Sequence, residues 1–154
     1  MREQLAVMTG GDRSIRSPDP RLVDLLLAAF HRVHARLGPG FGRGVYRRAL
    51  AVEIEKSGGE CLVDVELEVF YRDRPVGTTE PDLVVGGSGL VLIGAGRLLS
   101  AENAAQLANV VRATGWPWGL WCNFGPVPEH WLVADSGATA GNLGGVETRA
   151  VCAP

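Results

Sequence analysis

The chain has 154 residues, of which 46% are hydrophobic and 21% charged, and its net charge is −2. These proportions are ordinary for a soluble globular protein, and the length suits one domain that buries a core without disulfides or metals. The slightly acidic balance excludes a general attraction to polyphosphate, so a nucleic-acid site would require a local basic patch.

The sequence also bears on where the protein resides. Cys61, Cys122 and Cys152 show no CxxC spacing, which indicates free thiols in a reducing compartment. The N-terminal residues contain no apolar stretch long enough for a signal peptide. No segment reaches about 18 consecutive apolar residues, the length typical of a membrane span. We therefore expect a cytoplasmic protein without membrane contact.

Two helices are expected in the first third of the chain. Asp19 as N-cap and Pro20 at the first helical position begin a helix whose apolar residues recur at helical spacing as far as Leu37. Gly38-Pro39-Gly40 ends this helix. A second helix is expected over about 43–56. Its apolar side should consist of Val45, Tyr46, Ala49, Leu50 and Ile54.

The middle of the chain changes to a period of two, which is typical of strands. Over residues 61–71, apolar side chains alternate with acidic ones, as in a strand with one solvated face. Residues 72–77 are expected to form a turn, and Gly86-Gly87-Ser88-Gly89 to connect a hairpin. The remaining expected elements are hairpin strands at 82–85 and 90–93, a helix at 101–114, a strand at 116–123 and a short edge strand at 131–133.

These elements predict one domain with an α/β (α+β) fold. Strands grouped as a meander and followed by a helix and another strand imply a mixed β-sheet flanked by helices. We place the domain at residues 19–135, between an N-terminal arm at 1–18 and a Gly- and Ala-rich C-terminal tail at 136–154. Because both ends lack a sustained period, we expect them to be loose or ordered by a partner.

Five short motifs follow one another in the order and at the spacing of a known family. They are Val33-His34-Ala35-Arg36-Leu37-Gly38-Pro39-Gly40 with Val45-Tyr46, then Pro81-Asp82-Leu83-Val84-Val85, Gln106-Leu107, Thr114-Gly115 and Asn123-Phe124-Gly125. Over residues 21–125 the chain thus resembles the GxxExxY proteins, a branch of the PD-(D/E)XK nuclease superfamily. The resemblance implies a core like that of restriction endonucleases.

The resemblance also implies a catalytic site, of which the chain retains little. In the superfamily an Asp and a Glu hold Mg²⁺, and a Lys two residues after the Glu supports the nucleophile during phosphodiester hydrolysis. Asp82 matches the Asp, and Gln106 matches a residue of the helix near the site. Gly94-Ala95-Gly96 occupies the positions of the expected Glu-x-Lys, and Arg43 occupies the position of the Glu that gives the family its name.

These replacements predict a catalytically inactive site. One carboxylate holds a hard divalent ion poorly, because Mg²⁺ leaves water only for concentrated negative charge. Losing groups that act as a unit typically removes several orders of magnitude of rate. We therefore expect no cofactor, with Mg²⁺ bound only if Glu80 or Glu102 supplies the missing carboxylate in a rearranged site.

Five arginines on the two predicted helices allow three interpretations. They can form a phosphate-tracking patch left from DNA binding, or ordinary solvated helix faces, which we prefer. In the third interpretation they pair with acidic residues of a neighbouring molecule. The arginines are Arg32, Arg36, Arg43, Arg47 and Arg48, and the acidic residues are Asp64, Glu66 and Glu68.

Several ring side chains have both a structural and a functional interpretation. His34 resembles the family's histidine near the site, although packing or capping at the end of the first helix explains it equally well. Tyr46 is expected to be a core residue with a satisfied hydroxyl.

Most tryptophans should be core residues, yet alternation sends Trp118 and Trp121 to opposite faces and Pro117 favours an edge strand. We therefore expect one or both tryptophans to contribute to a subunit contact.

These observations favour a catalytically inactive nuclease-fold protein with a structural, self-assembling or partner-binding role. The expected partner is a second copy of the chain or another protein. A nucleic-acid-binding module that keeps the groove without the chemistry is the alternative, which the acidic net charge disfavours. A Mg²⁺-dependent nuclease with a rearranged site is the third hypothesis.

Overall fold

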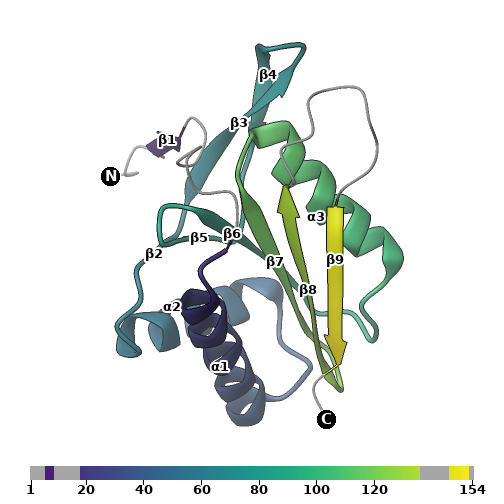
Figure 1. The fold of residues 1–154 in the computed structure, drawn as a ribbon. Coiled ribbons are helices and arrows are strands. Elements are labelled where there is room, and N and C mark those ends of the chain that lie inside the picture. Colours follow the sequence, from purple (N-terminus) through teal and green to yellow (C-terminus); the bar gives the residue numbers. More distant parts are fainter. Residues whose placement is uncertain (1–5, 9–17, 136–145, 153–154) are drawn as a thin grey trace.

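The computed structural model describes residues 6–8, 18–135 and 146–152. Within these ranges the chain forms two sheets, with strand orders β2-β5-β6-β7-β8-β9 and β1-β3-β4 (Figure 1). The helices are α1 (Pro20–Leu37), α2 (Arg43–Lys56) and α3 (Ala101–Thr114). The strands are β1 (Ala6–Met8), β2 (Cys61–Leu62), β3 (Val65–Tyr71), β4 (Arg74–Thr79), β5 (Leu83–Val85), β6 (Gly89–Gly94), β7 (Trp118–Phe124), β8 (Pro128–Asp135) and β9 (Val146–Cys152).

The helices have the predicted bounds, because their ends are encoded locally. Asp19 accepts a hydrogen bond from the backbone N–H of Arg21 at 2.9 Å, and Gly38 ends α1 with a φ of +67°. In α3 the Ser100 side chain accepts from the backbone N–H at the third helical position. Val45 was expected on the buried side of α2 but is 44% exposed, so that prediction is wrong. The buried residues of α2 are Tyr46, Leu50 and Ile54.

Two helical layers enclose the larger sheet, which confirms the predicted fold class (Figure 1). α1 and α2 pack on one face, where Phe30, Leu50 and Phe124 belong to one core. α3 packs on the opposite face and against β3, around a second core that contains Leu107 and Trp116. β6 and β7 pair in parallel while β5 and β6 pair antiparallel, so the sheet is mixed as predicted.

The predicted strand at 61–71 and the predicted turn at 72–77 both differ from the structure. Asp64 has a φ of +56°, and at this bend the chain leaves the larger sheet after β2 and enters the smaller one as β3. The reversal after β3 needs only Arg72 and Asp73, with φ values of +48° and +62°. β4 then begins at Arg74 and pairs antiparallel with β3.

The C-terminal strands extend the larger sheet beyond the prediction. The expected edge strand at 131–133 is the middle of β8, which lies between β7 and β9 and is not an edge. Residues 146–152, expected in a loose tail, form β9, and Ala6–Met8 of the expected arm pair in parallel with β3. The other residues of the expected arm and tail, apart from Pro18, lie outside the described residues. Among the described helices α1, α2 and α3, none is both long enough and apolar enough to cross a membrane.

The tryptophans of β7 are core residues. Trp118 is fully buried and Trp121 is 7% exposed, and they belong to the two different cores, as alternation predicts. Little of either side chain lies at the surface of the described chain, so their burial disfavours the expected subunit contact. Pro117 precedes β7, which lies between β6 and β8, and therefore does not mark an edge strand.

Candidate functional site

Asp82 lies immediately before β5 and is almost fully buried, with 2% of its surface exposed. Its backbone N–H donates to the carbonyl of Val91 at 3.0 Å, which attaches this residue to β6. Its side-chain Oδ2 accepts from the backbone N–H of Ile93 at 2.7 Å. The carboxylate is therefore held against the backbone of the neighbouring strand.

The other carboxylate oxygen of Asp82 is shared by two arginines of α2. Arg43 Nε lies 3.0 Å and Arg47 Nη2 3.1 Å from Oδ1, and Arg47 Nε donates to the same oxygen at 3.2 Å. The two arginines are four residues apart in the helix, so both project toward the same place. They bring two positive charges to a single negative one.

The strand segment after Ile93 supplies no further charge to the site. Residues 93–96 read Ile-Gly-Ala-Gly, and Ile93 is buried in the core under α1 and α2. A Cβ at Gly94 would lie 2.6 Å from Nε1 of Trp121 and 2.7 Å from Oδ1 of Asn123. Those two side chains fill the space that a larger residue at position 94 would need.

Cys122 lies close to Asp82 and remains a neutral thiol. Burial, and to a lesser extent the negative charge of Asp82, raises the pKa of the Cys122 thiol far above its usual value. A thiolate is the form that attacks electrophiles and binds metals. Its complete burial and raised pKa are those of a small apolar core residue.

The residues around Asp82 do not fit the Mg²⁺ ion that the resemblance implies. Such an ion takes oxygen ligands, mostly carboxylates and water. Both oxygens of Asp82 already accept from N–H groups, and two of the donating groups are guanidinium cations. The described residues also contain no group of three or more His, Cys, Asp or Glu arranged to hold a metal.

A sequence comparison identifies the family of the chain. The model of the PD-(D/E)XK nuclease superfamily matches residues 20–132, which include both N-terminal helices, Asp82 and α3. The chain belongs to the PD-(D/E)XK nuclease superfamily. No curated protein and no solved structure matches it significantly.

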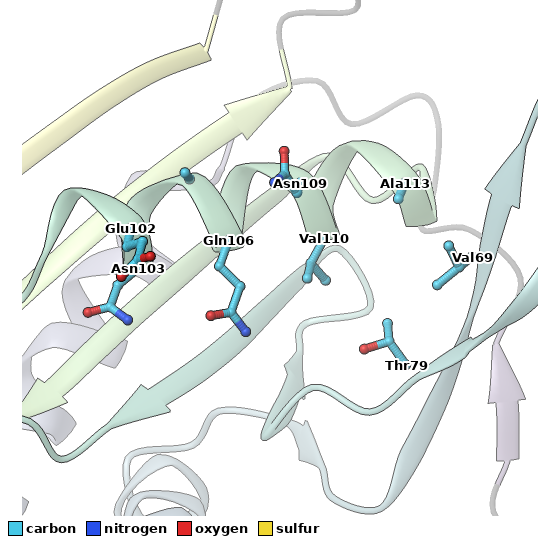
Figure 2. Close-up of a pocket in the computed structure, with 9 residues that line it drawn as sticks. Val69, Thr79, Glu102, Asn103, Gln106, Asn109, Val110 and Ala113 are labelled. Carbon is cyan, nitrogen blue, oxygen red and sulfur yellow. The ribbon is translucent and has the colours of Figure 1, made fainter.

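The structure does not bring Gln106, expected as a second remnant of the superfamily's site, to Asp82. Gln106 and Glu102 project from α3 into an open groove of about 540 Å³, together with Val69 and Thr79 of the β3–β4 hairpin (Figure 2). α3 covers the face of the larger sheet opposite to α2, which carries the partners of Asp82. Glu102 therefore lies across the sheet from the arginines that bind Asp82. Glu80 is exposed.

The five arginines do not act as one basic patch. Arg32 of α1 pairs with Glu53 of α2 at 3.1 Å and donates to Ser57 Oγ at 2.7 Å, so it links the two helices. Arg43 and Arg47 bind Asp82. Arg36 and Arg48 are exposed, and they alone of the five make no such ion pair with the described residues. This distribution disfavours the phosphate-tracking interpretation.

The segments that carry the superfamily resemblance contact one another through His34 and Tyr46. His34 Nε2 lies 2.8 Å from the carbonyl oxygen of Gly125. Tyr46 donates to the carbonyl of Gly38 at 2.6 Å, and its ring stacks on Phe124 with 4.2 Å between centroids. Tyr46 is thus a core residue with a satisfied hydroxyl, as predicted, and His34 has a structural role.

The partnership of Arg47 with Asp82 is the feature that sequence reasoning missed. Sequence reasoning placed Arg43 at the position of the family's Glu. It gave Arg47 three interpretations, namely a phosphate patch, a solvated helix face or a contact with a neighbouring molecule, and none of them involved Asp82. The spacing of four residues between the two arginines is the signal that could have indicated a shared target. Identifying Asp82 as that target requires the contact between α2 and β6, which only the structure supplies.

Proposed function

We propose that this chain is a superfamily member without metal-dependent nuclease activity, with a structural, self-assembling or partner-binding role. One observation carries this proposal. The carboxylate of Asp82, which matches the metal-binding Asp of the superfamily, is bound by Arg43, Arg47 and the N–H of Ile93. The arginines supply the positive charge that a metal ion would otherwise bring.

Electrostatics decides between the arginines and a metal. Two unit charges about 4 Å apart interact by roughly 4 kcal/mol near a protein surface, so a divalent ion beside one guanidinium is repelled by roughly twice that. A second guanidinium adds to the repulsion. A nuclease site gathers several carboxylates to overcome the hydration of Mg²⁺, whereas the charges next to Asp82 have the opposite sign.

We further propose that the chain is a divergent member of the GxxExxY branch. Arg43 stands at the Glu of the motif in Gly40-Phe41-Gly42-Arg43-Gly44-Val45-Tyr46. Support comes from the contacts that join the motif segments, such as the Tyr46 ring on Phe124 and His34 on Gly125. In this interpretation the scaffold of the branch is kept while its chemistry is lost.

Plasmid digestion tests the absence of nuclease activity. Purified protein is incubated with supercoiled plasmid and Mg²⁺ or Mn²⁺, beside the Asp82→Ala variant and a mock purification. We expect all three to leave the plasmid equally intact. Cleavage by the wild type that disappears in Asp82→Ala would refute the proposal, and cleavage lost in Glu80→Gln or Glu102→Gln would identify a rearranged site.

A gel shift tests the nucleic-acid-binding alternative. Of the five arginines on α1 and α2, Arg36 and Arg48 are exposed and make no ion pair with the described residues. They are the arginines that a nucleic-acid-binding module could still use. Phosphate contacts strengthen as salt is removed, so binding would be strongest at low ionic strength. We expect no retardation of duplex or single-stranded DNA there, and salt-sensitive retardation that is lost in Arg36→Gln/Arg48→Gln would support the alternative instead.

A further inference from the structure

The outward face of α2 carries apolar side chains that lie open to solvent in the described structure. Val45 and Val52 are 44% and 49% exposed. They are seven residues apart, which places them on one side of the helix at 3.6 residues per turn. Arg48 and Glu55 are exposed and lie beside them on the same side. We call these four residues the α2 ridge.

The ridge continues into a groove at the edge of the larger sheet. Glu55 lines this groove, which has a volume of about 430 Å³, together with Cys61, Leu62 and Val84. Leu62 is itself 52% exposed and belongs to β2, which is the outermost strand of the larger sheet. Exposed apolar side chains next to a concave surface are typical of an interaction site.

The ridge carries two charges of opposite sign, one turn or more apart along the helix. Arg48 lies in the N-terminal half of α2 and Glu55 in its last turn. The residues three and four positions from either of them are uncharged. Around Arg48 they are Gly44, Val45, Ala51 and Val52, and around Glu55 they are Ala51, Val52, Gly58 and Gly59. Neither charge therefore has an ion-pair partner along its own helix.

We propose that a second copy of this chain docks on the α2 ridge, with the two α2 helices antiparallel about a two-fold axis. An antiparallel copy brings Glu55 opposite the Arg48 end of the ridge and brings Arg48 opposite the Glu55 end. When the helices cross between residues 51 and 52, Arg48 lies level with Glu55 of the second copy, and Val52 lies about 1.5 Å along the axis from Val52 of the second copy. The two Arg48 residues are then about 10 Å apart along the axis. The Arg48–Glu55 pair then occurs twice, as two-fold symmetry requires, and the Val52 pair lies at the axis.

This inference rests on the self-assembling part of the proposed function and names the surface involved. A second copy fits the ridge because the ridge is complementary to itself in both charge and apolar content.

Charge reversal with rescue tests the pairing. Wild-type protein, analysed by size exclusion with light scattering at tens of micromolar, should have the mass of two 16.4 kDa chains. Arg48→Glu and Glu55→Arg each place like charges together twice, and each should weaken dimerisation at least about tenfold. The double variant Arg48→Glu/Glu55→Arg restores opposite charges and should recover the dimer.

A matched pair of valine variants controls for general effects. Val52→Asp should dissociate the dimer, whereas Val76→Asp, at a 62% exposed valine of the β3–β4 hairpin, should not. Far-ultraviolet circular dichroism establishes that each variant is folded. A monomeric wild type, single charge variants that remain dimeric, or equal loss of the dimer in both valine variants would overturn the proposal. A monomer that still lacks nuclease activity refutes this inference alone, while a dimer that cleaves DNA refutes the proposed inactivity alone.

Discussion

Replacing Asp82 by alanine should destabilise the folded protein, because the carboxylate is a structural anchor for two arginines and a backbone N–H. The substitution leaves the buried N–H of Ile93 without an acceptor, which costs about 1–3 kcal/mol. It also leaves Arg43 and Arg47 beside each other without their counter-charge.

The exposure of Arg43 and Arg47 determines how much the loss of their ion pairs with Asp82 destabilises the protein. Breaking a fully buried ion pair costs about 3–5 kcal/mol. The side chains of Arg43 and Arg47 are 57% and 29% exposed, so solvent screens their charges. Losing these ion pairs should therefore cost closer to the range of about 0–1 kcal/mol that is found for surface pairs. We expect the free energy of unfolding to fall by about 3 kcal/mol in total.

Urea unfolding followed by tryptophan fluorescence measures this loss, since Trp116 and Trp118 are fully buried. Two controls separate the contributions. Asp82→Asn keeps an oxygen for the Ile93 N–H and should lose less than alanine, while Arg43→Ala should change the unfolding free energy by no more than about 1 kcal/mol. An Asp82→Ala variant as stable as the wild type, or more stable, would refute this reasoning. Such a result is expected in an acidic metal site, where removing one carboxylate relieves its repulsion by the other carboxylates.

Three further predictions concern the neighbourhood of the site. Gly94→Glu should destabilise the protein by about 1–3 kcal/mol through overpacking. Gly96→Lys should be nearly neutral, since a Cβ at position 96 meets its nearest atom at 3.7 Å. Thermal unfolding of the two variants compares their stabilities. With the other two cysteines replaced by serine, Cys122 should react with a thiol reagent only after unfolding, because burial raises its pKa and hides its sulfur. Burial lowers the pKa of His31 and His130 below 6.5, so the unfolded chain binds protons more readily, and stability should fall as the pH drops below about 6.5. His130→Asn should flatten that pH dependence in urea titrations, and an unchanged slope would contradict the assignment to His130.

The sequence predicted the helices better than the strands for a physical reason. Asp19, Pro20 and the glycines after Leu37 determine the ends of α1 through contacts within a few residues. The ends of α3 are likewise encoded by Ser100 and Gly115. Such local signals can be read without knowledge of the rest of the fold.

Strand pairing depends on residues far apart in the chain and was predicted less well. β8 was expected to be a short edge strand, but it is eight residues long because β7 and β9 supply partners on both sides. The switch between sheets at Asp64 depends on a positive φ at a non-glycine residue, which no sequence pattern indicates.

The site was likewise predicted only where its features depend on the local sequence and not on packing. The match of Asp82 and the absence of charged residues at 94–96 can be read from the sequence. That α2 presents Arg43 and Arg47 to Asp82, and that Gln106 faces the opposite side of the sheet, follows only from the packing of helices on the sheet.

Divalent-metal binding is the most direct test of the central claim. Mn²⁺ has a paramagnetic signal that is lost when the ion binds protein, so a titration monitored by electron paramagnetic resonance counts bound ions without requiring catalysis. With Arg43 and Arg47 on Asp82, wild type and Asp82→Ala should bind equally little Mn²⁺ up to millimolar concentrations. Saturable binding of one ion per wild-type chain that Asp82→Ala abolishes would contradict the account.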